Sequence, residues 1–228
     1  FALWGKQIMI FLKNITVSYN KKSILQNFSL TLPEQGAVCL FAPSGSGKTT
    51  LLSMIAGLKQ GFSGQVQGLK GKKVSVVFQE NRLLPGVTAL SNVSVALPKG
   101  QEQQAAFWLE QVGLREAANL LPEELSGGMQ RRVAIARALA WGGDIYLLDE
   151  PFQGLDQELK NKLMDIIRSR AKGSLVVLVT HSWESALTFA DQVVVCSGQP
   201  MEIQKQFAIA EPYGKRDTTA LLTKYGQG

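Results

Sequence analysis

The fold class that the sequence predicts is α/β, with a mostly parallel central sheet. Residues 145–148 and 175–179 are short, continuously apolar runs, as strands buried on both faces of a parallel sheet are. Segments with helical spacing of apolar residues alternate with such runs, and strands predominate near both ends of the chain. A small-residue loop at residues 42–50 joins an apolar strand at 37–41 to a helix. This order is typical of the carboxyl edge of a parallel sheet.

Strands dominate the first third of the chain. Apolar residues alternate over Ile8–Leu12 and again over Ile15–Tyr19, which predicts an early strand with one buried face. A second strand is expected at residues 24–32. Short strand-like pieces follow in the glycine-rich segment 61–71, and a stronger strand occupies residues 74–78. We expect an antiparallel β subdomain in this part of the chain, beside the parallel core.

Helical patterns replace the strands after Arg82, at residues 88–97 and 101–112, and a further helix begins near Gly128. This change predicts an inserted helical subdomain. The expected divisions of a single domain 1–228 are a core with its β subdomain at about 1–81 and 140–210, a helical subdomain at about 82–139, and a tail at about 211–228.

Composition excludes several classes of protein. The net charge of +6 is moderate, and the basic residues form no run with interleaved aromatics, so no nucleic-acid partner is expected. Cys39 and Cys196 lie in apolar runs without disulfide or metal-ligand spacing, which indicates a reducing compartment. No apolar run approaches the ~20 residues of a membrane span. Residues 1–4 are apolar but end at Gly5-Lys6, so we expect no signal peptide there.

The loop Ala42–Thr49 has the composition of a phosphate-binding loop. Gly45 and Gly47 let the backbone turn and approach a phosphate, and the start of the following helix directs N–H groups and a positive dipole end at the same point. Lys48 can reach terminal phosphates, and the Thr49 hydroxyl can hold Mg²⁺. The alternative is a turn that only caps a helix. The expected nucleotide-binding residues here are Ser44, Gly45, Ser46, Gly47, Lys48, Thr49 and Thr50.

Two adjacent carboxylates, Asp149 and Glu150, follow the buried strand at residues 145–148. Ligands gather at the carboxyl ends of parallel strands, so both are expected near the phosphate loop. Asp149 would complete the Mg²⁺ shell, and Glu150 would orient or deprotonate a water molecule. The alternative is an acidic pair that caps the next helix.

His181 and Gln79 also follow the ends of predicted strands. His181 is the only histidine of the chain, and a neutral imidazole there could donate a hydrogen bond to a γ-phosphate. The amide oxygen of Gln79 suits Mg²⁺ or a water molecule. The alternatives are a structural histidine and an ordinary surface glutamine.

A second phosphate-type element begins at Ser126. Ser126 can cap a helix, and Gly127-Gly128 expose backbone N–H groups at the helix start. A plain capped helix is the alternative. Because the first loop already supplies one site, this element is expected to serve the nucleotide of another subunit in a head-to-tail homodimer.

Taken together, these motifs resemble the nucleotide-binding subunit of ATP-binding-cassette (ABC) transporters, from about Ile8 to the start of the tail. The phosphate loop is similar to the family's Walker A motif, Ile145–Asp149 to Walker B, and Leu125–Gln130 to the signature motif. The resemblance implies a phosphate-loop NTPase core, with Glu150 as catalytic glutamate, Gln79 as Q-loop glutamine and His181 as switch histidine. Tyr19 falls where the family stacks an aromatic ring on adenine, although it could also be a strand-end tyrosine.

Function and partners follow from the resemblance. It implies a sandwich dimer that binds two ATP molecules and hydrolyses them with Mg²⁺, each nucleotide lying between Walker A of one chain and the signature motif of the other. Asp156, in the loop that contacts the other subunit, belongs to the set acting in trans. The family subunit lies peripherally on the cytoplasmic face of the cell membrane and drives transmembrane permease subunits, which a solute-binding protein serves. Residues 79–85 and 149–152 resemble those of importers for nitrate, sulfonate, taurine and related small molecules.

Three departures from the family pattern stand out. Ala42 replaces the first glycine of Walker A, which would introduce strain if that position requires a positive φ. Gln153-Gly154 stands where small residues are usual, and the segment 57–78 is short. Two other functions stay open. One is a soluble ABC-type ATPase acting on nucleic acid or ribosomes; the other, which Ala42 and Gln153 motivate, is a non-hydrolysing, ATP-responsive module.

Overall fold

A six-stranded central sheet organises the structure, a computed structural model that describes residues 8–20 and 22–226. The strand order is β5-β6-β7-β3-β8-β9; the first five strands run parallel, and β9 pairs antiparallel with β8. The strands are β3 (Gly36–Phe41), β5 (Val74–Val77), β6 (Ile145–Asp149), β7 (Leu175–Thr180), β8 (Gln192–Ser197) and β9 (Glu202–Ala208). The mostly parallel sheet that the apolar runs predict is thus confirmed.

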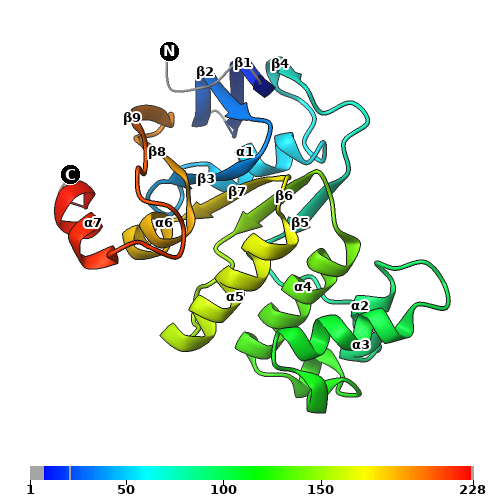
Figure 1. Ribbon diagram of the computed structural model, residues 1–228. Coiled ribbons are helices and arrows are strands. Elements are labelled where there is room, and N and C mark those ends of the chain that lie inside the picture. The colour runs from blue at the N-terminus through cyan, green and yellow to red at the C-terminus, as the bar shows by residue number, and fades with distance from the viewer. Residues whose placement is uncertain (1–7, 21, 227–228) are drawn as a thin grey trace.

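A second sheet is antiparallel and lies over one face of the central sheet, with helix α1 (Lys48–Ile55) beside both (Figure 1). Its order is β2-β1-β4, formed by β1 (Ile8–Tyr19), β2 (Lys22–Pro33) and β4 (Ser63–Gln67). Alternate residues of the central strands, such as Leu147 and Val177, share one apolar core with α1 and this sheet. The expected antiparallel β part is therefore present.

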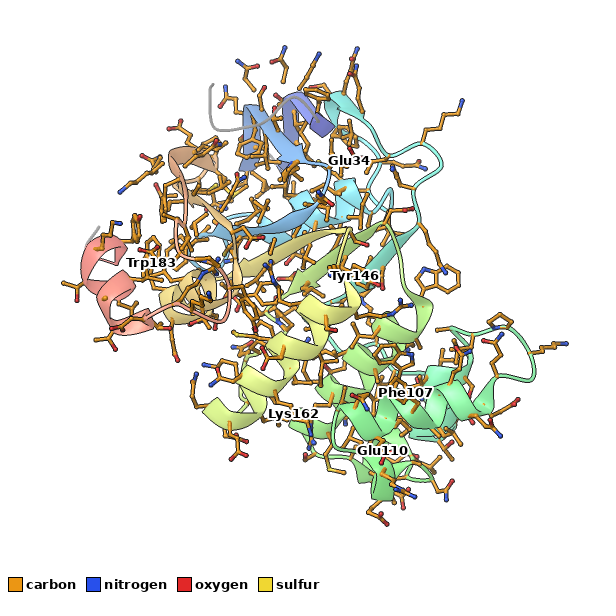
Figure 2. The ribbon with its side chains drawn as sticks, viewed as in Figure 1. Glu34, Phe107, Glu110, Tyr146, Lys162 and Trp183 are labelled. Atoms are coloured by element: carbon orange, nitrogen blue, oxygen red, sulfur yellow. The ribbon has the colours of Figure 1, made fainter. Side chains whose placement is uncertain are left out.

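Helices cover the opposite face of the central sheet. Tyr146 and Leu148 point to this side because side chains alternate along β6, and they join a second core (Figure 2). Helix α4 contacts β5 of the central sheet, and α2 and α3 pack against α4 (Figure 1). The helices are α2 (Ala89–Ser94), α3 (Glu102–Gln111), α4 (Gly127–Trp141), α5 (Gln157–Arg170), α6 (Trp183–Phe189) and α7 (Thr218–Tyr225), with 3-10 turns at Arg115–Ala117 and Pro122–Glu124.

Element boundaries follow the local sequence signals closely. Asp156 caps α5, since its side chain accepts the N–H of Leu159 at 2.9 Å. The strand expected to end at residue 78 ends at Val77.

Residues 1–4, for which no signal peptide is expected, lie outside the described residues. In the part of the chain that the structure describes, no helix is long and apolar enough to cross a membrane.

Candidate active site

A cavity of about 80 Å³ lies where β5, β6 and β7 end beside the start of α1. It brings together half of the predicted site residues and one additional residue, Gln153, which the sequence marks only as a departure from the family pattern. The lining residues are Ser44, Gly45, Lys48, Thr49, Gln79, Asp149, Glu150, Gln153 and His181. A larger cavity of about 150 Å³, lined by Glu34, Lys72 and Asp144 among others, lies at the opposite ends of the strands and shares no residue with this one.

The phosphate loop turns sharply between β3 and α1. Gly45 has φ 77° and Gly47 has φ 106°, a backbone region that glycine adopts readily. At Gly47 a Cβ atom would clash with Cγ2 of Ile24 in β2, so any side chain there would displace the Ile24 side chain. Helix α1 begins at the next residue, Lys48, with its free N–H groups directed at the loop.

Ala42, the departure in this loop, is unstrained. Its side chain is fully buried in the core between the two sheets, and its N–H donates to the Thr180 carbonyl at 3.3 Å, which continues the pairing of β3 with β7. The non-glycine residues with positive φ in the described chain are Asn14, Asn20, Asn27, Arg82 and Glu150. The strain that a positive φ would cause at Ala42 is therefore absent.

Lys48 and Asp149 are buried charges at the base of the cavity. The Lys48 ammonium donates to the carbonyls of Ala42 and Pro43, both at 2.7 Å, and burial lowers its pKa. Asp149 is 2% exposed, and burial raises its pKa, while the Thr49 hydroxyl, which donates to Oδ2 at 2.6 Å, opposes that shift. A hydroxyl and a carboxylate at this distance are oxygen ligands of the kind that Mg²⁺ binds.

Glu150 is held from three directions by the segment after β7. The Thr180 hydroxyl donates to Oε2 at 2.9 Å, the His181 backbone N–H donates to Oε1 at 2.9 Å, and His181 Nδ1 lies 2.6 Å from Oε1. Glu150 also has φ 48°, an uncommon conformation for a residue with a side chain. Sequence reasoning missed Thr180, whose only signal was its place directly before His181.

An aromatic pair joins the histidine segment to the phosphate-loop strand. Trp183, two residues after His181, stacks on Phe41 at the end of β3, with ring centroids 4.0 Å apart. A salt bridge between Lys160 and Glu184, 3.4 Å long, joins the start of α5 to α6. These contacts fix the backbone around His181 relative to the loop.

Several predicted residues do not line the cavity. Ser46, Gly47 and Thr50 belong to the loop and α1 but are not among its lining residues. The buried Ser46 hydroxyl has no hydrogen-bond partner among the described residues. Tyr19 is 43% exposed, and the Lys59 ammonium lies 4.4 Å from its ring centroid.

The four residues predicted to act in trans also lie outside this cavity. Ser126 caps α4 by accepting the Met129 N–H at 3.3 Å, and Gly127 and Gly128 form its first turn. A Cβ atom at Gly128 would lie 3.6 Å from Leu155, the residue before Asp156, so the two elements are neighbours.

A phosphate loop with a hydroxyl–carboxylate pair and an oriented glutamate on a parallel sheet defines an ATPase of the phosphate-loop class. The family model for ABC transporters matches residues 25–153, so the chain belongs to the ABC transporter family.

Individual relatives of the chain belong to the same family. The chain is 38% identical to the aliphatic sulfonates import ATP-binding protein SsuB 1 of Pseudomonas savastanoi pv. phaseolicola, over 90% of each chain. It is 35% identical to the protein of the same name from Pseudomonas aeruginosa, over 96% of this chain and 94% of the relative. Among solved structures, the dimeric ATP-binding cassette MJ0796 bound to ADP and Pi matches with a TM-score of 0.80 at 31% identity, covering 90% of this chain and 100% of that one.

The chain is therefore an ATP-binding and ATP-hydrolysing subunit of an ABC transporter. The relatives favour neither an ATPase acting on nucleic acid or ribosomes nor a non-hydrolysing module.

Proposed function

We propose that this chain powers the import of a small solute and that aliphatic sulfonates are the solute class. The relatives described above are named for aliphatic sulfonate import, and the matches span nearly the full length of both chains. Residues 79–85 and 149–152 independently resemble importers of the nitrate, sulfonate and taurine group. The single observation that supports hydrolysis is the convergence of the phosphate loop, Asp149 and Glu150 on one cavity.

In this proposal the loop backbone and Lys48 hold the ATP phosphates, and Thr49, Asp149 and Gln79 hold Mg²⁺. The close Thr49–Asp149 pair and the amide oxygen of Gln79 offer oxygen ligands only, which fits this ion. No group of three or more acidic, histidine or cysteine side chains that could hold a metal ion occurs in the described residues. Bound Mg²⁺ would neutralise charge on the β- and γ-phosphates.

Glu150 is the proposed general base, and its orientation is set by Thr180 and His181. With Nδ1 of His181 turned to Glu150, its other ring nitrogen remains to contact the γ-phosphate. Tyr19 is proposed to stack on adenine with the ring face that Lys59 does not cover.

Ser126, Gly127, Gly128 and Asp156 are proposed to act on the nucleotide of a second copy of the chain in a head-to-tail dimer. They lie at the starts of α4 and α5, outside their own chain's cavity, where free N–H groups suit an anion. The solved cassette most relevant to this point is described as a dimer bound to ADP and Pi.

The remaining partners are transmembrane permease subunits and, indirectly, a solute-binding protein. The proposed location is the cytoplasmic face of the membrane, as a peripheral subunit, with no nucleic-acid partner. We also propose the division of the single domain 1–228 into a core, a helical subdomain at about 82–139 and a tail from about 211.

Replacing Glu150 by Gln tests the hydrolytic assignment. Turnover of ATP should fall by ~10²–10⁴, the usual effect of losing a general base, while ATP binding persists. Replacing Lys48 by Ala should instead weaken ATP binding itself. Wild-type turnover in Glu150→Gln would contradict the assignment of the base.

Uptake of a labelled aliphatic sulfonate into cells with and without this chain tests the substrate class. Uptake should depend on the chain and should be lost in cells that carry only Glu150→Gln. Chain-dependent uptake of nitrate, without uptake of any aliphatic sulfonate, would support the importer function and reject the sulfonate assignment.

A further inference from the structure

The loop that carries Gln79 follows strand β5 and is hydrogen-bonded to helix α4. The guanidinium of Arg131, in the second turn of α4, donates through Nη1 to the Phe78 carbonyl at 2.6 Å and through Nη2 to the Gln79 carbonyl. Arg131 is only 8% exposed, so this fork lies in a largely dry environment where hydrogen bonds to a charged donor are strong.

A second arginine of the same helix extends the attachment. Arg137 donates to the carbonyls of Asn81 at 3.2 Å and Arg82 at 2.9 Å. Four carbonyls of the segment 78–82 are therefore bound by two side chains of α4. The segment also folds on itself, since Arg82 has φ 46° and its guanidinium lies 3.9 Å from the Phe78 ring centroid.

The helix that holds this segment begins with the proposed trans site. Gly127 and Gly128 lie one turn before Arg131, about 6 Å along the helix axis. The side chain of Gln79, by contrast, is exposed and lines the cavity with Asp149 and Thr49 of its own chain. A single helix thus contacts the proposed site for the partner's nucleotide at its start and the backbone of Gln79 one turn later.

We propose that Arg131 is a positioning residue for Gln79: its fork on the Phe78 and Gln79 carbonyls sets where the Gln79 amide lies in the cavity beside Asp149 and Thr49. This proposal rests on the function proposed above. Because the fork fixes the Gln79 backbone, its loss would let the Gln79 amide shift within the cavity. Displacements of about 1 Å at such groups cost up to ~10²-fold in rate.

A double-mutant cycle tests the coupling. Arg131→Met removes the fork but keeps an unbranched apolar side chain, and it should lower kcat for ATP on the order of 10-fold, with a smaller change in KM, since phosphate binding is intact. In a Gln79→Ala background the same substitution should change kcat by less than about 2-fold, because the group on which Arg131 acts is gone. Arg170→Met is the matched control. Arg170 also donates to a backbone carbonyl of another element, that of Leu139 at 3.0 Å, and its replacement should leave kcat unchanged in both backgrounds.

The kcat values of the single and double variants distinguish positioning of Gln79 from a purely structural role of Arg131. Equal kcat losses from Arg131→Met with and without Gln79 would overturn the proposal, because a purely structural role adds to the loss of Gln79. Wild-type kcat in Gln79→Ala would instead reject the role of Gln79 on which the proposal rests.

Arg131→Lys provides a second variant should Arg131→Met unfold. Burial raises the pKa of Asp149, and the charge of Arg131 is one of the influences that lower it, so charge alone is a competing explanation. A lysine keeps the charge but cannot form the fork. The proposal predicts that Arg131→Lys partly lowers kcat in the wild-type background and has no further effect in the Gln79→Ala background. Wild-type kcat in Arg131→Lys would overturn the proposal.

Discussion

His181 Nδ1 lies 2.6 Å from Glu150 Oε1, and the same carboxylate oxygen accepts the backbone N–H of His181 at 2.9 Å. One residue therefore holds the proposed base in two ways, and only one of them depends on the imidazole. Glu150 is 7% exposed whereas the His181 side chain is 48% exposed, so the imidazole spans from the buried carboxylate to the open side of the cavity.

Replacing His181 by Ala should lower ATP turnover by ~10²-fold, because the contact to the developing charge on the γ-phosphate is lost while the backbone N–H still orients Glu150. ATP binding should persist, since the phosphate loop is unchanged. Phosphate release at saturating ATP and binding of a fluorescent nucleotide measure the two effects. Unchanged ATP turnover in His181→Ala would mean that the imidazole has only a structural role.

Replacing Thr180 by Val should lower turnover on the order of 10-fold, because Glu150 Oε2 loses a buried hydrogen bond worth roughly 1–3 kcal/mol to a charged acceptor. The side chain is 3% exposed and valine has nearly the same shape, so packing is retained. Thr180→Ser, which keeps the hydroxyl, is the control and should hydrolyse ATP within about 2-fold of wild type. Equal activity in the two variants would show that the hydroxyl has no part in turnover.

Replacing Ala42 by Gly, the more usual residue of this motif, should raise neither the stability of the protein nor its ATP turnover. Glycine removes a fully buried methyl group and adds chain entropy to the unfolded state, which together should lower the free energy of unfolding by about 1–2 kcal/mol. Turnover should stay within about 2-fold, because the Ala42 carbonyl that accepts Lys48 is retained. Denaturant unfolding measures the first effect, and a gain in stability would mean that the methyl group is strained.

Chain order was sufficient to locate most of the cavity because its residues follow strand ends. Gln79 follows β5, Asp149 ends β6 and His181 follows β7, and parallel strands place their carboxyl ends at one edge of the sheet. The phosphate loop follows β3, which pairs with β7. The sheet class and the helix starts were predictable for the same reason, since both depend on local patterns.

Contacts made across long stretches of sequence were not predictable. Arg131 looks like any polar residue of a helix, and only the structure shows that it reaches Phe78, 53 positions earlier. Thr180 carries no motif apart from its neighbour. The positive φ of Glu150 likewise has no signal in the local sequence.

Acid should destabilise the protein partly through Asp191, which joins three parts of the chain. It accepts the Ala37 N–H at 2.8 Å, a bidentate pair of bonds from Arg168 and a bond from Arg216 at 3.3 Å. Burial alone would raise the pKa of Asp191, but the bonds from Arg168 and Ala37 outweigh it and hold the pKa below its usual value. The stabilisation is therefore complete above the unfolded pKa of ~3.9 and disappears as pH falls through the lower folded pKa.

Replacing Asp191 by Asn should lower the free energy of unfolding at neutral pH by about 1–2 kcal/mol, less than for a fully buried pair because the Asp191 side chain is 37% exposed. That difference between variant and wild type should shrink when unfolding is measured at progressively lower pH, below about 4. Glu110→Gln is the control, since the Glu110–Arg115 pair is largely exposed and its loss should cost less than about 0.5 kcal/mol (Figure 2). A difference for Asp191→Asn that does not vary with pH would show that the carboxylate charge contributes nothing and that only its shape matters.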